Sequence, residues 1–253
     1  MGTKRLWRQT WPMKPETPQH EALRKALLQA IDALGLGAHR DTLLGLLKPA
    51  IGLQTRAVTD ADLAVGATRV GGEPDLPPAL QVSLAQVAAL DLEGLLPSDG
   101  LLSVFSDPWA RDVRVLHHTQ GLVLERRPTP SLSRRPAFRA CGVDLLPELH
   151  FPPPHSELVT LSSDAFDVYW DEVWLPWRET LRPGPAGACG IHQLLGYAVA
   201  ERDEAQGLND EVLIGFDSDD RAAMEWGDVH CVWAIIDRAE LIARNFGALR
   251  PEM

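Results

Sequence analysis

The sequence of 253 residues is 45% hydrophobic and 23% charged, and its formal net charge is −11. A globular chain of this length forms one large domain or two small ones and buries roughly 70–75% of the surface that it exposes when unfolded. The acidic balance argues against nucleic-acid binding and against binding to anionic membranes, because both depend on excess Lys and Arg.

Two further features favour a cytoplasmic protein. No apolar run approaches the roughly 18 residues of a membrane-spanning helix, and "MGTKRLWRQTWPMKP" at the N-terminus lacks the apolar core of a signal peptide. The three cysteines, Cys141, Cys189 and Cys231, are far apart and form no CxxC pair. They predict neither a disulfide framework nor a zinc site, and we expect no cofactor.

Residues 1–50 are predicted to form an N-terminal arm and two helices, separate from a domain at 51–253. Thr17 is a suitable cap and Pro18 a suitable first-turn residue for a helix that ends before Gly35. Its apolar stripe is predicted to consist of Leu23, Ala26, Leu27, Ala30, Ile31 and Leu34. A second helix is expected at 41–48. Residues 1–40 carry a net charge of +4, which is compatible with a solvated arm or with one that pairs with the acidic remainder, a second copy or a partner.

From residue 51 the chain alternates short apolar runs with Gly, Pro and Asp, which is typical of antiparallel sheet. A longer helix is expected within 163–181 and a short one at 237–246. Two Pro-rich stretches, 127–136 and 151–154, are predicted loops. The fold class is therefore α+β with mostly antiparallel sheets and an N-terminal helical extension. The predicted strands are 51–58, 81–87, 100–107, 113–118, 121–127, 193–200, 211–217 and 229–236.

A weak internal repeat is compatible with two similar sheet units. "VGG" (70–72) precedes "VSLAQV" and "LLSVF", and "LLGY" (194–197) precedes "VLIGF" and "CVWAI". The interval from Gly72 to Val104 is 32 positions, and that from Gly196 to Val232 is 36. Two similar sheet units that face each other around a pseudo-twofold axis would fit these intervals.

Six short motifs, in this order and spacing, resemble the YwqG-like family, a bacterial domain family of unknown function. They are "RVGGEPDLP" (69–77), "SLAQV" (83–87), "LLPSDGLLSVFSD" (95–107), "HQLLGY" (192–197), "VLIGFDSDD" (212–220) and "WGD" (226–228). The sequence departs from the family pattern at Thr68, at Gln193 and directly after Tyr197, where the family often has Ser, Lys and Gln. The resemblance, over about residues 51–246, implies an α+β fold, a cytosolic location, no established activity, and an immunity or partner-binding role.

Two motifs offer polar groups for a small ligand. "GGEPDLP" has two glycines that permit positive φ, so it is either a structural turn or an anion-binding loop. His192 in "HQLLGY" could act as an acid, base or ligand, or could simply hydrogen-bond a backbone group or carboxylate. An enzyme or ligand-binding protein would place a pocket between the two sheet units. We expect that pocket to be lined by Gly72, Asp75, Gln86, His192 and Tyr197.

The stretch "GFDSDDRAAMEWGD" (215–228) has three interpretations. As an EF-hand it fails, because Arg221 and Ala222 occupy positions that need an oxygen ligand and a glycine. Clustered carboxylates could instead provide a catalytic acid and base. The pattern favours a polar turn between strands, with an acidic surface that binds a basic protein partner. The residues expected on that surface are Asp217, Asp219, Asp220, Trp226 and Asp228.

No catalytic signature or metal-ligand spacing is present. His117 and His118 would point to opposite faces of a strand, and His150 and His155 lie around a Pro-rich stretch without cysteine. The first hypothesis is therefore a non-enzymatic interaction protein, with an immunity-like role as one form of it. The alternative is an enzyme or ligand-binding protein with a polar cleft between the sheet units.

Overall fold

The computed structural model describes residues 13–71, 78–107, 112–119, 121, 123–125, 138–180, 192–198, 209–226 and 231–252. Gly72, Asp75, Asp228 and Cys189 lie outside these residues, as do residues 1–12 of the N-terminal arm and the whole 127–136 loop. Within them, no helix is both long and apolar enough to cross a membrane.

The N-terminal helices form as expected. The Thr17 side chain accepts a hydrogen bond from the backbone N–H of His20, and Pro18 begins the helix. The buried face matches the predicted stripe only in part. Ile31 is fully buried as expected, but Leu23 is 38% exposed, and His20, which is outside the stripe, is fully buried. The elements are α1 (Pro18–Ala33), the 3-10 turn Leu36–His39 and α2 (Arg40–Leu46).

Within the described residues, ten strands form one antiparallel sheet, which confirms the α+β fold class. Their order is β10-β9-β8-β7-β1-β6-β2-β3-β4-β5, with β1 and β6 at the centre. The strands are β1 (Lys48–Ala57), β2 (Arg69–Val70), β3 (Pro78–Ser83), β4 (Leu101–Asp107), β5 (Asp112–His118), β6 (Cys141–His150), β7 (Gln193–Leu195), β8 (Asp210–Phe216), β9 (Val232–Asp237) and β10 (Arg250–Glu252).

This strand order has the two-unit character that the internal repeat suggests. Strands β1–β5 correspond in turn to strands β6–β10. If each strand is exchanged with its counterpart (β1 with β6, β2 with β7, and so on), the strand order is the observed one read from the opposite edge of the sheet. The meanders β2–β5 and β7–β10 therefore flank the central pair. Each meander pairs with the central strand of the other unit, because β2 pairs with β6 and β7 pairs with β1. Gly71 after β2 and Gly196 after β7 both have positive φ, at 66° and 78°.

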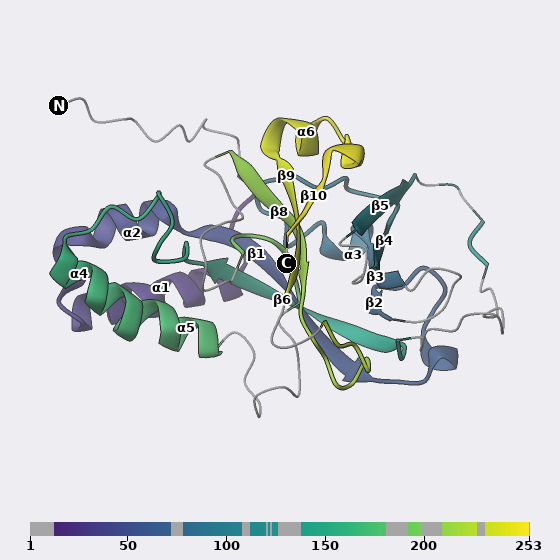
Figure 1. Ribbon diagram of the computed structural model, residues 1–253, viewed down its shortest axis with the longest axis horizontal. Coiled ribbons are helices and arrows are strands. Elements are labelled where there is room, and N and C mark those ends of the chain that lie inside the picture. Colours follow the sequence, from purple (N-terminus) through teal and green to yellow (C-terminus); the bar gives the residue numbers. More distant parts are fainter. Residues whose placement is uncertain are drawn as a thin grey trace.

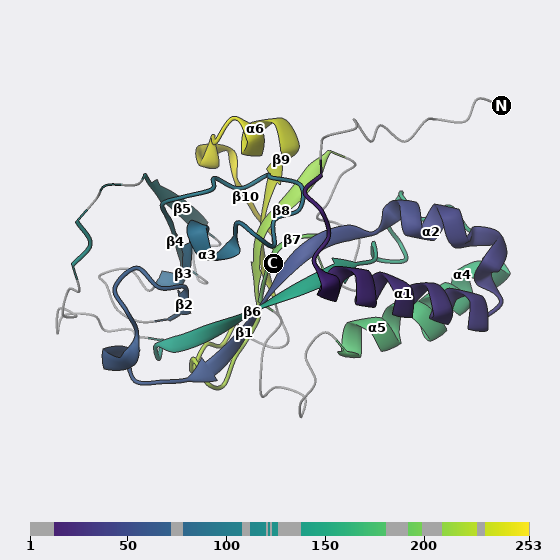
Figure 2. The same ribbon diagram turned by 180° about the vertical axis from the view of Figure 1, so that it is seen from behind.

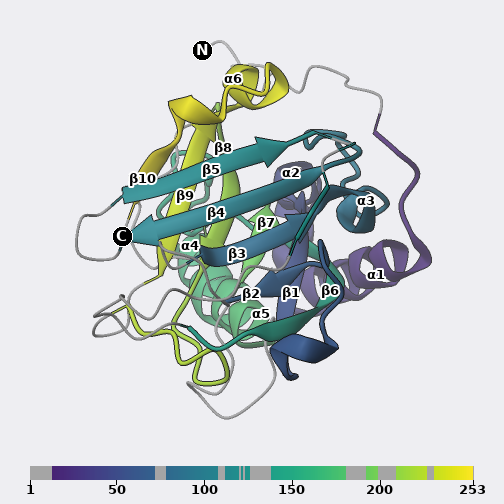
Figure 3. The ribbon, with the colours of Figure 1, turned by 90° about the vertical axis from the view of Figure 1, so that its right-hand side faces the viewer.

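The sheet bends so that the two meanders face each other. Figure 3 shows β2–β5 crossing in front of β7–β10, and the main core lies between them. This core includes Val82, Leu102 and Val104 from one meander and Leu213, Phe216 and Ala234 from the other. Apolar side chains thus occupy the interface between the two units.

A helical layer covers the far end of the central strands. Figures 1 and 2 show α1, α2, α4 (Ser163–Val168) and α5 (Leu175–Thr180) gathered at one end of β1 and β6. A second core cluster joins Leu149 and Phe151 at the end of β6 to Ile31, Leu43 and Tyr169 of the helices. The helices are therefore an integral layer, packed on the sheet by apolar side chains.

Between α4 and α5 the chain makes a π-helical segment, Tyr169–Trp174. The N–H of Leu175 donates to the carbonyl of Trp170, five residues back. Pro176 lacks an N–H and its ring would clash with the carbonyl four residues earlier, so a local widening before it is expected. The helix predicted within 163–181 is therefore confirmed, with a wider turn inside it.

Three sequence predictions need correction. Residues 84–87 were expected to continue a strand but form the short helix α3 (Leu84–Val87). Residues 123–125, within a predicted strand, have no regular structure. The strand β6, by contrast, was not predicted. The remaining C-terminal elements are α6 (Arg238–Ile242), close to the expected position, and a 3-10 turn at Phe246–Ala248.

Gly71→Ala should destabilise the fold by about 3 kcal/mol, because positive φ and overpacking each cost on the order of 1–3 kcal/mol. A Cβ at Gly71 would lie 2.2 Å from the carbonyl oxygen of Arg139. Urea unfolding followed by circular dichroism measures the change. Gly37→Ala is the matched control, because its Cβ would meet nothing within 4 Å. Equal stability of the two variants would contradict this account of Gly71.

Candidate functional site

The short strand β7 and the residues after it are a buried polar centre of the molecule. All seven residues from His192 to Ala198 are buried. Because neighbouring strand residues point to opposite faces of a sheet, His192 and Gln193 enter two different polar networks. The motif "HQLLGY" is thus the point where these networks meet.

The first network joins His192 to the turn after β8. His192 Nε2 lies 3.0 Å from Oδ2 of Asp219, and the Thr55 hydroxyl donates to the same oxygen at 2.6 Å. The other oxygen, Oδ1, accepts the backbone N–H groups of Arg221 at 2.7 Å and Ala222 at 3.3 Å. The carboxylate therefore has four donors, which confirms the expectation that His192 bonds to a backbone group or carboxylate.

These contacts define the charge states. Burial raises the pKa of Asp219, but hydrogen bonds from His192 and Thr55, the attraction of His192 and the Arg221 N–H outweigh it and lower the pKa to about 2. His192 Nδ1 accepts the backbone N–H of Asp217 at 3.3 Å. Because Nδ1 accepts this bond, Nε2 is the ring nitrogen that donates to Asp219.

The stretch 217–226 is a closed turn, as predicted. Asp219 and Met224 exchange backbone hydrogen bonds at 2.8 and 2.9 Å. The Trp226 indole donates to the carbonyl of Asp217 at 3.2 Å, and its ring packs 5.2 Å from that of Phe216. The turn is fixed from inside by its own side chains.

The structure corrects the acidic surface expected on this turn. Asp219 is 0% exposed and Trp226 only 6%, so neither side chain is available to a partner. Asp217 is half-buried, whereas Asp220 and Glu225 are exposed. Asp219 is therefore an internal anchor of the turn, and the surface that the turn offers is smaller than predicted.

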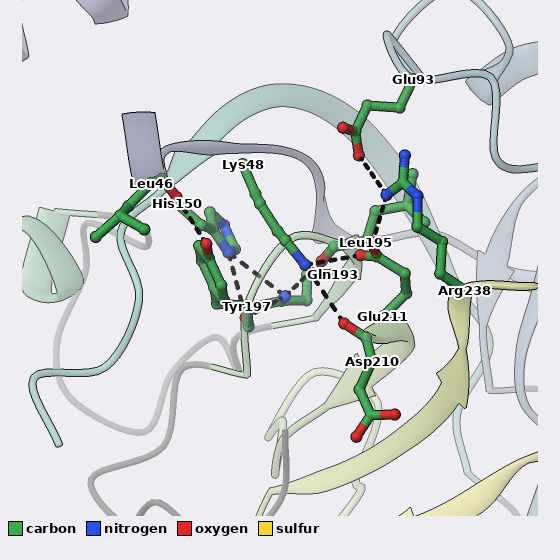
Figure 4. Close-up of polar contacts among 10 residues, drawn as sticks. All are labelled: Leu46, Lys48, Glu93, His150, Gln193, Leu195, Tyr197, Asp210, Glu211 and Arg238. Atoms are coloured by element: carbon green, nitrogen blue, oxygen red, sulfur yellow. Dashed lines mark hydrogen bonds and ion pairs between the residues drawn. The ribbon is translucent and has the colours of Figure 1, made fainter. Parts of the chain in front are cut away.

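The second network lies on the opposite side of β7 (Figure 4). The Gln193 side chain donates from Nε2 to the carbonyls of Leu195 and Tyr197, both at 2.8 Å. His150 of β6 packs beside it, with Nε2 2.9 Å from Oε2 of Glu148. The Tyr197 hydroxyl donates to the carbonyl of Leu46 at 2.7 Å, which ties this segment to the end of α2.

An ion-pair chain continues from this network toward the opposite meander. Lys48 Nζ lies 3.0 Å from Oε2 of Glu211 and 4.9 Å from the centre of the Tyr197 ring. The other oxygen of Glu211 is 2.5 Å from Nη1 of Arg238, which also lies 3.3 Å from Glu93. Glu211 is 3% exposed, so its charge is balanced by two cations inside the fold.

Backbone strain accompanies these contacts. Leu195 is a buried non-glycine residue with φ of 61°, followed by Gly196 with φ of 78°. A Cβ at Gly196 would lie 2.7 Å from Nδ1 of His150. This conformation costs on the order of 1–3 kcal/mol, and it turns the Leu195 and Tyr197 carbonyls toward Gln193.

The described members of the predicted ligand pocket bond to separate partners. Gln86 accepts hydrogen bonds from the backbone N–H and hydroxyl of Thr68, at 3.1 and 2.7 Å. His192 and Tyr197 bond instead to Asp219 and to the carbonyl of Leu46, respectively. The other two members, Gly72 and Asp75, lie outside the described residues. Each described member thus has its own partners within the fold.

The sequence signal for some of these residues was incomplete. Thr55, Glu148 and Glu211 were not predicted to be functional, although each supplies a buried polar contact. Each of the three shares its strand with other polar residues, as Thr55 does with Gln54 and Arg56, so no local pattern marked it as buried. No group of three or more metal-ligating side chains occurs among the residues that the structure describes.

Comparison with known proteins gives one family match. A family model described as "Domain of unknown function (DUF1963)" matches residues 68–250. Of the ten described strands, the matched region includes β2 to β9 in full and the first residue of β10, and it includes both polar networks except for Leu46, Lys48 and Thr55. No curated protein matches the chain.

Asp219→Asn should lower the free energy of unfolding by about 2 kcal/mol at pH 7. The Asp219 pKa is depressed in the folded state, from 3.8 to about 2, so its charged form stabilises the fold above pH 4. This advantage over the Asn variant should shrink as the pH falls from 5 to 2. Denaturant unfolding across this range measures it, with exposed Asp220→Asn as the control. A pH-independent difference would contradict the charged role of Asp219.

Glu211→Gln should destabilise the protein by about 3 kcal/mol, because it removes the carboxylate that pairs with Lys48 and leaves Arg238 with Glu93 alone. Asp144→Asn is the matched control. It removes a carboxylate from an ion pair with Arg56 in which both side chains are more than half exposed, and such pairs contribute about 0–1 kcal/mol. Thermal unfolding of both variants measures the contrast. Similar losses would show that burial does not set the strength of these pairs.

Proposed function

The chain belongs to the DUF1963 family of domains of unknown function, and from this premise we propose that it is a non-enzymatic, cytoplasmic protein-interaction module. The proposal includes its resemblance to YwqG-like proteins. Its partner is a protein with a basic surface, and protection against a toxin is one form that this role can take. The recognition elements are exposed acidic side chains.

The observation that carries this proposal is the burial of the catalytic-type groups. The His192–Asp219–Thr55 chain has the chemistry of an acid–base relay, but its members are 1%, 0% and 2% exposed. His150 and Glu148 are 0% and 6% exposed. A general acid or base must come within about 3 Å of the substrate atom that it protonates or deprotonates. Groups closed off in this way support the fold rather than a reaction.

The charge of the chain supports the nature of the partner. The net charge is −11. Two buried carboxylates have partners inside the fold: Glu211 pairs with Lys48 and Arg238, and Asp219 accepts hydrogen bonds from four donors. Acids on the outside, such as Asp220 and Glu225, are free to contribute to long-range attraction. Complementary charge mainly raises association rate and specificity.

Affinity capture from the source cell with the tagged full chain tests this role. We expect a stoichiometric partner with a basic surface, bound more weakly as salt is raised. Charge reversal of exposed acidic residues should reduce recovery of this partner. The substitution His192→Asn should not reduce it when the variant is folded and as stable as the unmodified protein under the capture conditions. The test variants are Asp220→Lys/Glu225→Lys and Asp167→Lys/Asp171→Lys.

Recovery of no protein above the bead control would contradict the proposal. So would a catalytic turnover abolished by His192→Asn. A thermal-shift screen against metals, nucleotides and sugars provides an independent check, because a saturating ligand should stabilise the fold by a few kcal/mol. A clear shift with any small molecule would favour the ligand-binding alternative.

A further inference from the structure

The helical segment that runs from α4 through the π-helical turn Tyr169–Trp174 to α5 has an outer face that does not contribute to the core. Its inner side buries Ala165, Tyr169, Val173 and Trp174 in the helical core cluster. Phe166 and Trp170 are only half-buried and lie at the margin of this cluster. The segment therefore presents two large aromatic rings partly to solvent, next to the side chains that it buries in the core.

Three rings form one continuous group on this face. The ring of exposed His155 lies 4.8 Å from that of Trp170 and 5.6 Å from that of Phe166. Phe166 and Trp170 are stacked, with centroids 6.4 Å apart and planes at 29°. Trp170 in turn packs 5.6 Å from the fully buried ring of Trp174. The outer rings are thus held in place by the core beneath them.

A row of carboxylates lies beside the rings. Asp164, Asp167 and Asp171 are all exposed, and helical spacing of three and four places them along one stripe. Asp167 is three positions before Trp170, on the adjacent turn. Residues 155–179 contain six acids and one base, Arg178, so a strong negative field surrounds the aromatic group.

We propose that this acidic aromatic face (His155, Phe166, Trp170, Asp164, Asp167 and Asp171) binds an arginine-rich segment of a protein partner. The inference rests on the proposed function and specifies its surface. A guanidinium can stack on an indole while its N–H groups bond to carboxylates on either side. The face supplies both elements at adjacent positions, which is the combination that arginine recognition uses.

Charge complementarity favours an arginine-rich segment over the other ligands that this face could bind. A nucleic acid would be repelled by the carboxylates, and an apolar helix would leave them without partners. Lysine offers a compact, strongly hydrated charge without a planar group, so it gains less from the stacked rings than arginine does. The arginine side chain matches both the rings and the acids.

Fluorescence anisotropy with labelled (Gly-Arg)4 and (Gly-Lys)4 peptides and the full chain tests the proposal. The Arg peptide should bind at least about fivefold more tightly than the Lys peptide. Asp167→Asn/Asp171→Asn should weaken Arg-peptide binding about tenfold, and Trp170→Leu should remove most of the preference for Arg over Lys. Circular dichroism confirms that each variant is folded, and the exposed Asp variants keep the test decisive if Trp170→Leu does not fold.

The matched control is Asp99→Asn/Glu125→Gln, which removes the same charge from two exposed positions outside the helical segment and outside the turn at 217–226. It should change binding less than twofold. An equal loss in this control, or equal affinity for the two peptides, would overturn the proposal and indicate general attraction to an acidic protein. If the capture experiment yields a partner that these helix variants do not affect, this inference fails while the interaction role stands. If Arg peptides bind as expected but no partner is captured, the interaction role fails instead.

Discussion

The antiparallel pairing of β1 with β6 is the contact on which the rest of the structure depends. Ten residues of each strand pair without interruption, from Lys48 with His150 to Ala57 with Cys141. Each strand also carries one meander on its outer edge, and the helical layer packs at the end of β6. These strands also supply the polar networks, with Lys48 and Thr55 from β1 and His150 from β6. Both halves and both networks are therefore fixed by one strand pair.

The polar networks hold together segments that are distant in the sequence. His192 bonds to a turn after β8, and Lys48 to a carboxylate at the start of β8. Burying such groups costs free energy unless every partner is in place, so they contribute more to a single arrangement than to overall stability. The strained backbone at Leu195 persists for the same reason, because Gln193 holds both adjacent carbonyls. A module with a rigid interior can present fixed surface groups to a partner at a low entropic cost.

Local signals in the sequence were sufficient for several elements. The Thr17 cap, the helix that contains Trp170 and the turn at 217–226 follow from residue type and spacing, and all are confirmed. The strand β6 was missed because Pro147 lies within it, and proline argues against a central strand. Here it is accommodated because β2 pairs with β6 only at Cys141 and Gly142, so the outer side of β6 at Pro147 pairs with no described strand.

The sequence alone determined the α+β class and the turn at 217–226, because these depend on periodicity and local turn chemistry. Tertiary structure decided which acids remain on the surface. Asp219 and Asp220 are neighbours of the same chemical type, yet one is fully buried and the other exposed. The difference depends on Thr55 and His192, which the sheet brings to Asp219 from 164 and 27 positions away. A linear pattern of charge records no such distant donors, and for that reason the exposed acidic surface could be located only in the folded chain.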